Sequence, residues 1–446
     1  MRTLFATIAA DGHVNPLTGI AVRLRSAGHD VRWYTGNPYA SRLDKLGIPH
    51  FPYRRADQHT DAASLASLPE RQRLHGLALL RYDFEKFFLA NTESYLADIR
   101  DIDAEFPFDV MFCDAAFLGA RLVREVLGKH VCGVGVGPSI ETSKDLPPNF
   151  LGKHPARTAP GRLVHRAMSA AMHRMVLAHG QGLYNDILGR HGLSPVTGSM
   201  FDEFYRGQHV VFQSGVPGFD YPRREMNPRV RFVGALLPHR AGVPSPFPYP
   251  DRLRGDQRVV LISQGTVDNH DPGKLIAPAL DALVGTGALL IVGTGHRNTD
   301  ELRRRYSHPN VIIEDYVDFH AVLQRADLFV CNGGYGSVLL SLANGVPLVT
   351  AGIREGKNDI NARVSYVRAG IDLRSEKPSS SAVGAAARRV LAEPQWRTNA
   401  LRLREELGQY RPFEIIEGYL AATLPDAWAR RELADAGDTA RRERTK

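Results

Sequence analysis

Two side chains able to exchange a proton each follow a short apolar run. His13 belongs to DGHVNP at residues 11–16, between an apolar run at residues 3–9 and an amphipathic segment at residues 17–27. A neutral imidazole at the carboxyl end of a strand can take a proton from a hydroxyl group, and a neighbouring helix N-terminus favours the neutral form. The alternative is that His13 only closes the turn.

Asp114 closes the apolar run at residues 110–113 and is therefore expected at the carboxyl end of another strand. A carboxylate there could orient the His13 imidazole and stabilise its charged form, which makes a His–Asp pair a candidate. A helix N-cap ahead of residues 115–127 is an equally sound role for Asp114.

Two glycine-containing loops offer backbone N–H groups to phosphate. NGGYGS at residues 332–337 follows an apolar run and opens a helix, and SQGT at residues 263–266 ends an earlier run. Small residues let phosphate oxygens approach the N–H groups at a helix N-terminus. A Gly-rich turn also serves packing alone, so each loop is weak evidence by itself. Together they favour a phosphate site.

The elements that must position these residues alternate in type. Residues 3–9, 17–27 and 30–34 form a β-α-β pattern, which predicts a parallel sheet. The Pro- and Gly-rich segment 239–251 predicts a linker, after which the alternation restarts. Ligands of open parallel sheets bind at the carboxyl ends of the strands. Further strands are predicted at residues 110–113, 131–136, 209–213, 230–233, 258–263, 288–292, 311–314, 328–331 and 348–351.

The composition supports two lobes with buried cores, since 43% of the 446 residues are hydrophobic. The net charge of +8 is spread along the chain without an aromatic-interleaved basic stripe, so nucleic acid is not an expected partner. No apolar run reaches the ~18–20 residues that span a bilayer. The three cysteines lie far apart and fit a reducing compartment, so we expect a cytoplasmic protein. The oligomeric state is not indicated.

The ordered set of motifs resembles the inverting, nucleotide-sugar-dependent glycosyltransferases of GT-B architecture, in particular bacterial enzymes that modify macrolides and other small natural products. The resemblance spans nearly the whole chain. It rests on GHVNP (12–16), GHDVRWYTG (28–36), SKDLPP (143–148), QSGVPGFDYPR (213–223), RFVGALLP (231–238), SQGTVDN (263–269), NGGYGS (332–337), NGVPLV (344–349) and NARV (361–364).

This resemblance implies an α/β protein of GT-B fold, with two Rossmann-like lobes facing each other across a cleft. Residues 1–238 would form the acceptor-binding lobe and residues 252–410 the lobe that binds the nucleotide sugar. Residues 411–424 would form a helix that crosses back to the first lobe, and residues 425–446 a mixed-charge tail.

Roles for individual residues also follow from the resemblance. His13 would act as general base on the acceptor hydroxyl and Asp114 would support it, while Tyr316 would stack on the nucleobase. The residues expected to bind the donor are Gly265, Thr266, Tyr316, Asn332, Gly333, Gly334, Gly336, Ser337, Lys357 and Asn358. No metal or cofactor beyond the nucleotide sugar is expected.

Phe84, Phe87 and Phe88 are the candidate acceptor-binding residues. They share helical spacing in the stretch 77–88, so they could wall an apolar acceptor pocket or belong to the helix core.

Three sites, comprising four residues, depart from the family pattern. Asn332 stands where the family often has His, Leu340 where it has Glu, and Lys357-Asn358 where it has Asp-Gln. In the family these positions contact phosphate, ribose and sugar hydroxyls, respectively. Leucine cannot accept a hydrogen bond from a ribose hydroxyl, which favours dTDP-sugars over UDP-sugars.

The sequence thus predicts an inverting transfer of a hexose from a UDP- or dTDP-sugar to a hydroxyl of a small, largely apolar acceptor. Two alternatives remain. One is a sugar-nucleotide epimerase of the same architecture, which needs no acceptor. The other is a degenerate, non-catalytic binding or helper protein in which Asn332, Leu340 and Lys357 have eroded the donor site.

Overall fold

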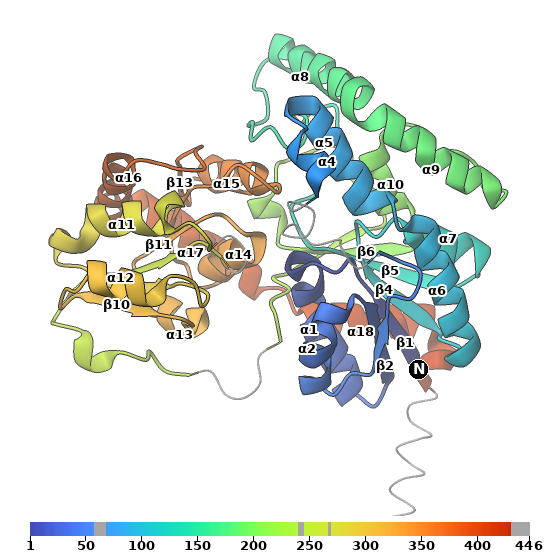
Figure 1. Cartoon of the computed structure of the whole chain (residues 1–446), viewed down its shortest axis with the longest axis horizontal. Coiled ribbons are helices and arrows are strands. Elements are labelled where there is room, and N and C mark those ends of the chain that lie inside the picture. Colours follow the sequence, from blue (N-terminus) through green and yellow to red (C-terminus); the bar gives the residue numbers. More distant parts are fainter. Residues whose placement is uncertain (58–67, 240–244, 266–268, 430–446) are drawn as a thin grey trace, which may run out of the picture.

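The computed structural model describes residues 1–57, 68–239, 245–265 and 269–429. It consists of two α/β lobes, each built on one parallel sheet (Figure 1). The first sheet has the strand order β3-β2-β1-β4-β5-β6-β7, and the second has the order β10-β9-β8-β11-β12-β13. This arrangement confirms the predicted fold class of two Rossmann-like lobes.

Most strands form where continuous apolar runs were found, and the short strands β3 and β13 are the exceptions. All five residues of β4, β8 and β9 are buried, as expected for strands covered on both faces by helices. The first sheet contains β1 (Arg2–Ala6), β2 (Asp30–Thr35), β3 (His50–Pro52), β4 (Val110–Asp114), β5 (His130–Gly135), β6 (Val210–Ser214) and β7 (Val230–Gly234). The second contains β8 (Val259–Ser263), β9 (Leu289–Gly293), β10 (Val311–Glu314), β11 (Leu328–Cys331), β12 (Leu348–Thr350) and β13 (Gly370–Asp372).

The helices of the first lobe include two π-helical turns. Glu85–Leu89 continues α5, and His173–Leu177 joins α8 to α9. The α-helices are α1 (Asp11–Ser26), α2 (Ala40–Lys45), α4 (Pro69–Gln72), α5 (Gly76–Phe84), α6 (Thr92–Glu105), α7 (Gly119–Val126), α8 (Ala159–Met172), α9 (Ala178–Arg190) and α10 (Met200–Arg206).

The predicted start of the first helix was wrong. Helix α1 begins at Asp11 rather than at residue 17, so His13 lies in its first turn and not in a loop ahead of it. Pro16 lies inside α1. A proline this close to the N-terminus removes only one hydrogen bond of the helical ladder, and the helix tolerates that loss.

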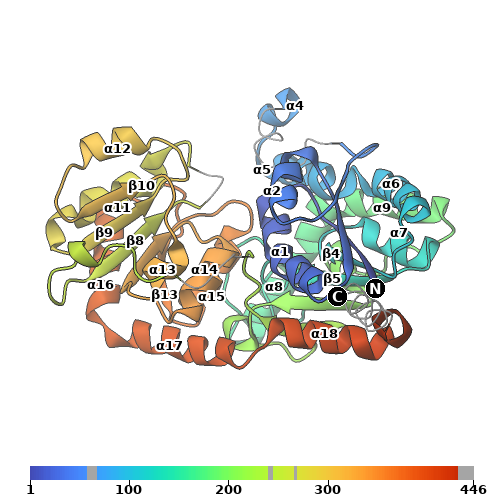
Figure 2. The ribbon, with the colours of Figure 1, turned by 90° about the horizontal axis from the view of Figure 1, so that it is seen from below.

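The helices of the second lobe cover its sheet, and α18 (Pro412–Thr423), which follows them, packs on the first lobe. They are α11 (Ile276–Leu283), α12 (Thr299–Arg305), α13 (Phe319–Leu323), α14 (Tyr335–Ala343), α15 (Lys357–Tyr366), α16 (Ser380–Ala392) and α17 (Pro394–Gly408). Helix α17 runs along the second lobe, and helix α18 continues from it along the first lobe (Figure 2). Its residues Ile416 and Leu420 are buried in the core of the first lobe, and Glu417 pairs with Arg23 at 2.7 Å.

The chain stays ordered past the point where a tail was expected to begin. Residues 425–429 form a further helical turn, Ala427 is buried, and the Trp428 ring lies 4.8 Å from the His29 ring. Packing of these two apolar side chains against the first lobe explains the difference. Residues 430–446 lie outside the described part.

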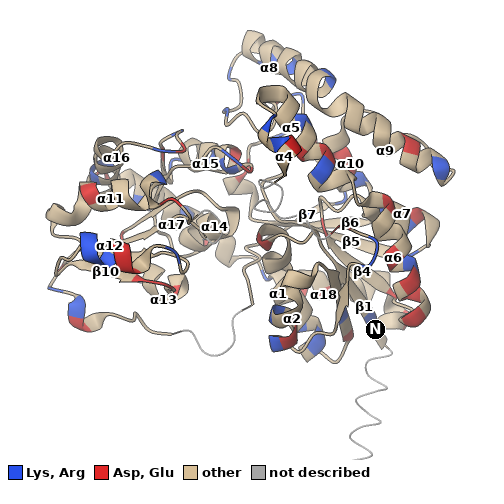
Figure 3. Ribbon diagram, in the orientation of Figure 1, with Lys and Arg blue, Asp and Glu red and all other residues tan. Residues whose placement is uncertain are grey.

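Charged side chains are distributed over both lobes with the two signs interspersed (Figure 3). None of the described helices is long and apolar enough to cross a membrane.

Candidate active site

His13 and Asp114 lie at the carboxyl edge of the first sheet and contact each other. Strand β1 leads into α1, which carries His13, and the adjacent strand β4 ends at Asp114. His13 Nδ1 lies 2.9 Å from Asp114 Oδ1, and the backbone N–H of Ile8 donates to the second carboxylate oxygen at 3.1 Å. Because a carboxylate only accepts, Nδ1 carries the proton and Nε2 presents its lone pair.

The environment of the pair suits proton transfer. The Asp114 side chain is fully buried, whereas 16% of the His13 side chain is exposed. His13 lies in the first turn of α1, directly after the loop that follows β1. Within the described residues, Nε2 has no protein partner, so it is free to accept a proton from a bound hydroxyl.

Phe87 packs against the His13 ring, with centroids 5.5 Å apart. It lies in the π-helical turn after α5, and such insertions are frequent at functional sites. Phe88 contacts Phe87 and Phe204, while Phe84 is 7% exposed and packs on Phe201 in the core. Of the three predicted acceptor-binding residues, Phe87 is therefore the one that lies beside His13.

The second sheet brings its strand-end loops together in the same way. Strands β8, β11 and β12 are neighbours, so the segments after Ser263, Cys331 and Thr350 lie side by side. The Asn332 side chain donates to the carbonyl of Gln264, which joins two of these loops. Gly265 has φ +86°, and a Cβ there would lie 3.0 Å from Asn332 Nδ2.

The expected phosphate loop opens α14 as predicted from its sequence. Gly334 is the N-cap residue, so the N–H groups of Tyr335, Gly336 and Ser337 lie in the first turn. Asn361 of α15 is fully buried and donates to Asn332 O at 3.4 Å and to Gly352 O at 3.0 Å. Helix α15 thus holds the loop 332–337 in place through the Asn361 side chain.

Lys357 and Asn358 begin α15 beside this loop, but their side chains are already engaged. Lys357 Nζ lies 2.7 Å from Glu355 Oε2, and the lysine side chain is only 11% exposed. Asn358 Nδ2 donates to the carbonyl of Phe150, a first-lobe residue, at 2.5 Å. The sequence did not indicate this contact between the lobes.

The remaining predicted residues are scattered around the second lobe. Tyr316 follows β10 and is 78% exposed, with no ring contact among the described residues. Thr266 lies outside the described residues. Leu340 is 8% exposed, and the hydroxyl of its neighbour Ser341 is buried and donates to Val346 O at 2.9 Å.

The carboxyl edges of the two sheets face each other, because contacts between the lobes join their strand ends. Tyr335, the first residue of α14, donates its hydroxyl to the carbonyl of Ser214 at the end of β6, at 2.7 Å. Burial raises the pKa of this phenol. Arg363 of α15 is buried, pairs with Asp220 of the first lobe at 2.8 Å, and lies over the Tyr221 ring. The His–Asp pair and the glycine-rich loop 332–337 are therefore on facing edges.

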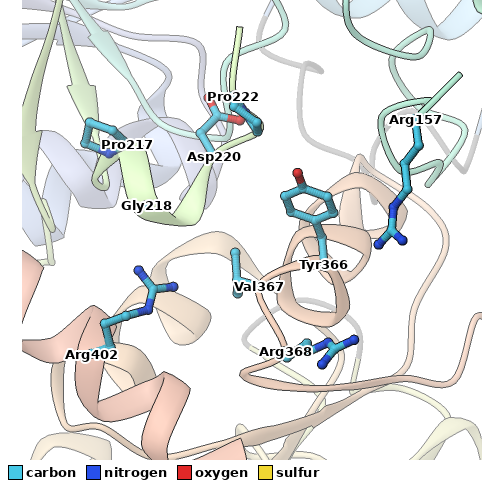
Figure 4. A pocket seen from close by; sticks show the side chains of 9 residues that line it. All are labelled: Arg157, Pro217, Gly218, Asp220, Pro222, Tyr366, Val367, Arg368 and Arg402. Carbon is cyan, nitrogen blue, oxygen red and sulfur yellow. The ribbon is translucent and has the colours of Figure 1, made fainter. Parts of the chain in front are cut away.

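A cavity of about 520 Å³ also lies between the lobes (Figure 4). Arg157 and Asp220 line it from the first lobe, and Tyr366, Arg368 and Arg402 from the second. None of the predicted site residues lines this cavity. Among the described residues, no group of three or more His, Cys, Asp or Glu side chains is arranged to hold a metal ion.

Comparisons with known proteins cover most of the chain. Residues 278–421 match the family model described as erythromycin biosynthesis protein CIII-like, C-terminal domain. The chain is 34% identical over 405 residues to 4'-demethylrebeccamycin synthase of Lentzea aerocolonigenes, covering 91% of this chain and 95% of that protein.

Solved structures show the same fold. The calicheamicin glycosyltransferase CalG4 aligns with a TM-score of 0.73 and 18% identity, over 95% of this chain and 98% of that one. The spinosyn rhamnosyltransferase SpnG complexed with thymidine diphosphate aligns with a TM-score of 0.67 and 16% identity, over 94% and 100%.

Proposed function

Because the chain belongs to the nucleotide-sugar-dependent glycosyltransferases of GT-B fold, we propose that it transfers a hexose to a hydroxyl of a small, largely apolar natural product, with inversion at the anomeric carbon. The observation that carries this proposal is the His13–Asp114 pair, which lies on the edge of the first sheet that faces the phosphate loop of the second. The comparisons support the enzyme class, and this geometry supports the mechanism.

In the proposed reaction, Nε2 of His13 removes the proton from the acceptor hydroxyl as its oxygen attacks the anomeric carbon. The new glycosidic bond forms as the bond to the diphosphate breaks, and the electron pair of that bond leaves on the phosphate oxygen. Asp114 holds Nδ1–H and stabilises the imidazolium that forms.

The charge that develops on the leaving diphosphate would be stabilised by the second lobe. Backbone N–H groups in the first turn of α14 and the dipole of that helix supply positive potential at Gly334–Ser337. This arrangement supports a transfer that needs no metal ion.

For the acceptor, the contact between Phe87 and His13 supports an apolar molecule, because an aromatic side chain borders the group that takes the proton. The name of the relative, 4'-demethylrebeccamycin synthase, supports a natural product.

For the donor, the surroundings of Leu340 support dTDP-sugars. Ser341 is fully buried and donates to the carbonyl of Val346, and the Asn344 amide donates to the carbonyl of Leu340 at 2.8 Å. The Ser341 hydroxyl is therefore already engaged and does not replace the ribose contact that Leu340 lacks, and the amide nitrogen of Asn344 is engaged as well. The structural neighbour that is complexed with thymidine diphosphate agrees with this preference.

The three cysteines support a reducing compartment, and we place the protein in the cytoplasm. Cys113, Cys132 and Cys331 are all free and buried, and burial raises the pKa of the Cys331 thiol to about 12.

A screen of UDP- and dTDP-sugars against a panel of aglycones, read by mass spectrometry and by NMR of the new anomeric centre, tests the proposal. We expect an inverted glycoside and free nucleotide only when an acceptor is present. An epimerised sugar nucleotide formed without acceptor would favour the epimerase. Nucleotide binding without any turnover across the panel would favour the non-catalytic alternative.

A further inference from the structure

The first-lobe segment from Phe150 to His154 is fastened to α15 over successive turns of that helix. Asn358 donates to Phe150 O at 2.5 Å, and Asp359 accepts from the N–H groups of Phe150 and Gly152 at 2.6 and 2.8 Å. His154 Nε2 lies 3.0 Å from Ala362 O. The second lobe therefore holds Phe150 and Gly152 by their backbone groups and His154 by its side chain.

The Asp359 carboxylate is buried where it accepts the N–H groups of Phe150 and Gly152. It is 8% exposed, and burial raises its pKa, although the N–H groups of the segment and nearby Arg363 oppose that shift. A buried carboxylate that accepts backbone N–H groups positions them strongly. Gly152 fits closely, since a Cβ there would lie 3.1 Å from Asn358 O.

The segment holds Phe150 in an unusual conformation. Its φ is +64°, a left-handed value that bulky residues seldom adopt and that persists where surrounding contacts impose it. The ring lies 3.6 Å from the position of a Cβ on Gly356, the N-cap residue of α15, and 5.5 Å from the Phe201 ring. Even so, 39% of Phe150 stays exposed.

This places an accessible aromatic ring from the first lobe directly over the start of α15. Lys357 follows Gly356, and its side chain lies against Gly352, next to the carbonyl of Asn332 in the phosphate loop. A sugar attached to a diphosphate at α14 would thus have the polar Lys357–Glu355 pair and the apolar Phe150 ring as neighbours.

Resting on the proposed function, we infer that Phe150 is a specificity-determining residue that packs on the C–H face of the transferred sugar, and that Asn358 and Asp359 are positioning residues that hold it there. Asn358 then acts on the sugar through the loop rather than by direct hydrogen bonding. The first lobe completes the sugar site only while this segment is docked on α15.

The test compares the dissociation constants of nucleotides with and without the sugar. Wild type and Phe150→Ala are titrated by calorimetry with UDP, UDP-glucose, dTDP and dTDP-glucose. We expect Kd for the free nucleotides to stay within about twofold, while the ratio of Kd for the sugar nucleotide to Kd for the nucleotide rises about 3- to 10-fold, the range typical of a lost aromatic contact. Phe413→Ala is the matched control, because Phe413 is similarly exposed but lies on α18.

The variant Asp359→Asn tests whether Asp359 positions the Phe150 segment or only stabilises the fold. We expect it to raise the same ratio while leaving nucleotide Kd unchanged, since an amide cannot accept from all the N–H groups that face the carboxylate. If Phe150→Ala leaves the ratio of Kd for the sugar nucleotide to Kd for the nucleotide unchanged, the inference is wrong while the proposed function stands. The same holds if the variant loses nucleotide and sugar-nucleotide binding equally. A wild-type protein that binds none of the four ligands overturns the proposed function together with it.

Discussion

The first sheet carries histidines at both of its edges, and the two sites differ in what faces the imidazole. At the carboxyl edge, His13 lies 2.9 Å from the buried Asp114 carboxylate. At the opposite edge, His130 stacks on His209 with centroids 4.3 Å apart, beneath Tyr419 of α18. A carboxylate lets an imidazole accept a proton at little cost, whereas a second imidazole opposes it. The first site therefore has the contacts of an acid–base pair, whereas at the second the two imidazoles stack and hydrogen-bond to the Tyr419 hydroxyl and the Val131 N–H.

The largest expected effect comes from removing the imidazole at the carboxyl edge. His13→Ala should lower kcat by ~10²–10⁴, because the general base is lost while the donor lobe is untouched. Nucleotide affinity, measured by calorimetry, should stay nearly the same. Unaltered turnover at saturating donor and acceptor would remove His13 from the mechanism.

The second prediction changes the carboxylate and keeps the imidazole. Asp114→Asn should lower kcat about 10- to 100-fold, less than His13→Ala, because the amide can still hydrogen-bond the ring but no longer stabilises its positive charge. Asp98→Asn is the control, since Asp98 is a buried carboxylate bonded to Tyr34 and to backbone N–H groups away from His13. Both variants are expected to melt at lower temperature, and a loss of kcat common to both would contradict a specific role for Asp114.

The carboxyl edge of the second sheet lacks a polar group where the family pattern has one, and this gives the third prediction. Wild type should bind dTDP at least as tightly as UDP, because Leu340 leaves the 2'-hydroxyl of a ribose without an acceptor. Leu340→Glu should move the ratio of the two Kd values towards UDP by about tenfold, or roughly 1.4 kcal/mol. A ratio that stays the same would mean that the ribose is held from elsewhere.

A fourth prediction concerns metal removal. Turnover should survive EDTA, since the first turn of α14 offers N–H groups to the diphosphate in place of a cation. Complete loss of activity that magnesium or manganese restores would contradict the proposed leaving-group stabilisation.

How far the sequence could predict these sites depends on how many positions separate the contacting residues along the chain. Continuous apolar runs located most strands within one or two residues, but β3 and β13 are three-residue edge strands without such a run. His13 and Asp114 could be placed at strand ends, although only the pairing of β1 with β4 brings them together. The contact of Asn358 with Phe150 joins residues 208 positions apart, and no local pattern predicts it.

The π-helical turns are a further feature that local sequence could not predict. Glu85–Leu89 lies in a stretch with ordinary helical spacing, yet the extra residue per turn changes the direction of Phe87 relative to Phe84. Only the packing of this turn shows which phenylalanine lies beside His13.

The smallest expected effect belongs to the packed histidines and concerns stability. Burial and the nearby His209 lower the pKa of His130 to about 4, below the value of about 6.5 for an unfolded histidine. Between these two values the unfolded chain binds a proton that the folded chain does not, so stability should fall as the pH drops from about 6.5 to 4. His130→Phe keeps the stacked ring without the titrating group, and its melting temperature should therefore fall less between pH 7 and pH 5 than that of wild type. The exposed His308, in the second lobe, supplies the control variant His308→Phe. If wild type and His130→Phe lose the same number of degrees over this interval, acid sensitivity arises elsewhere, and the two edges of the sheet differ less than their contacts indicate.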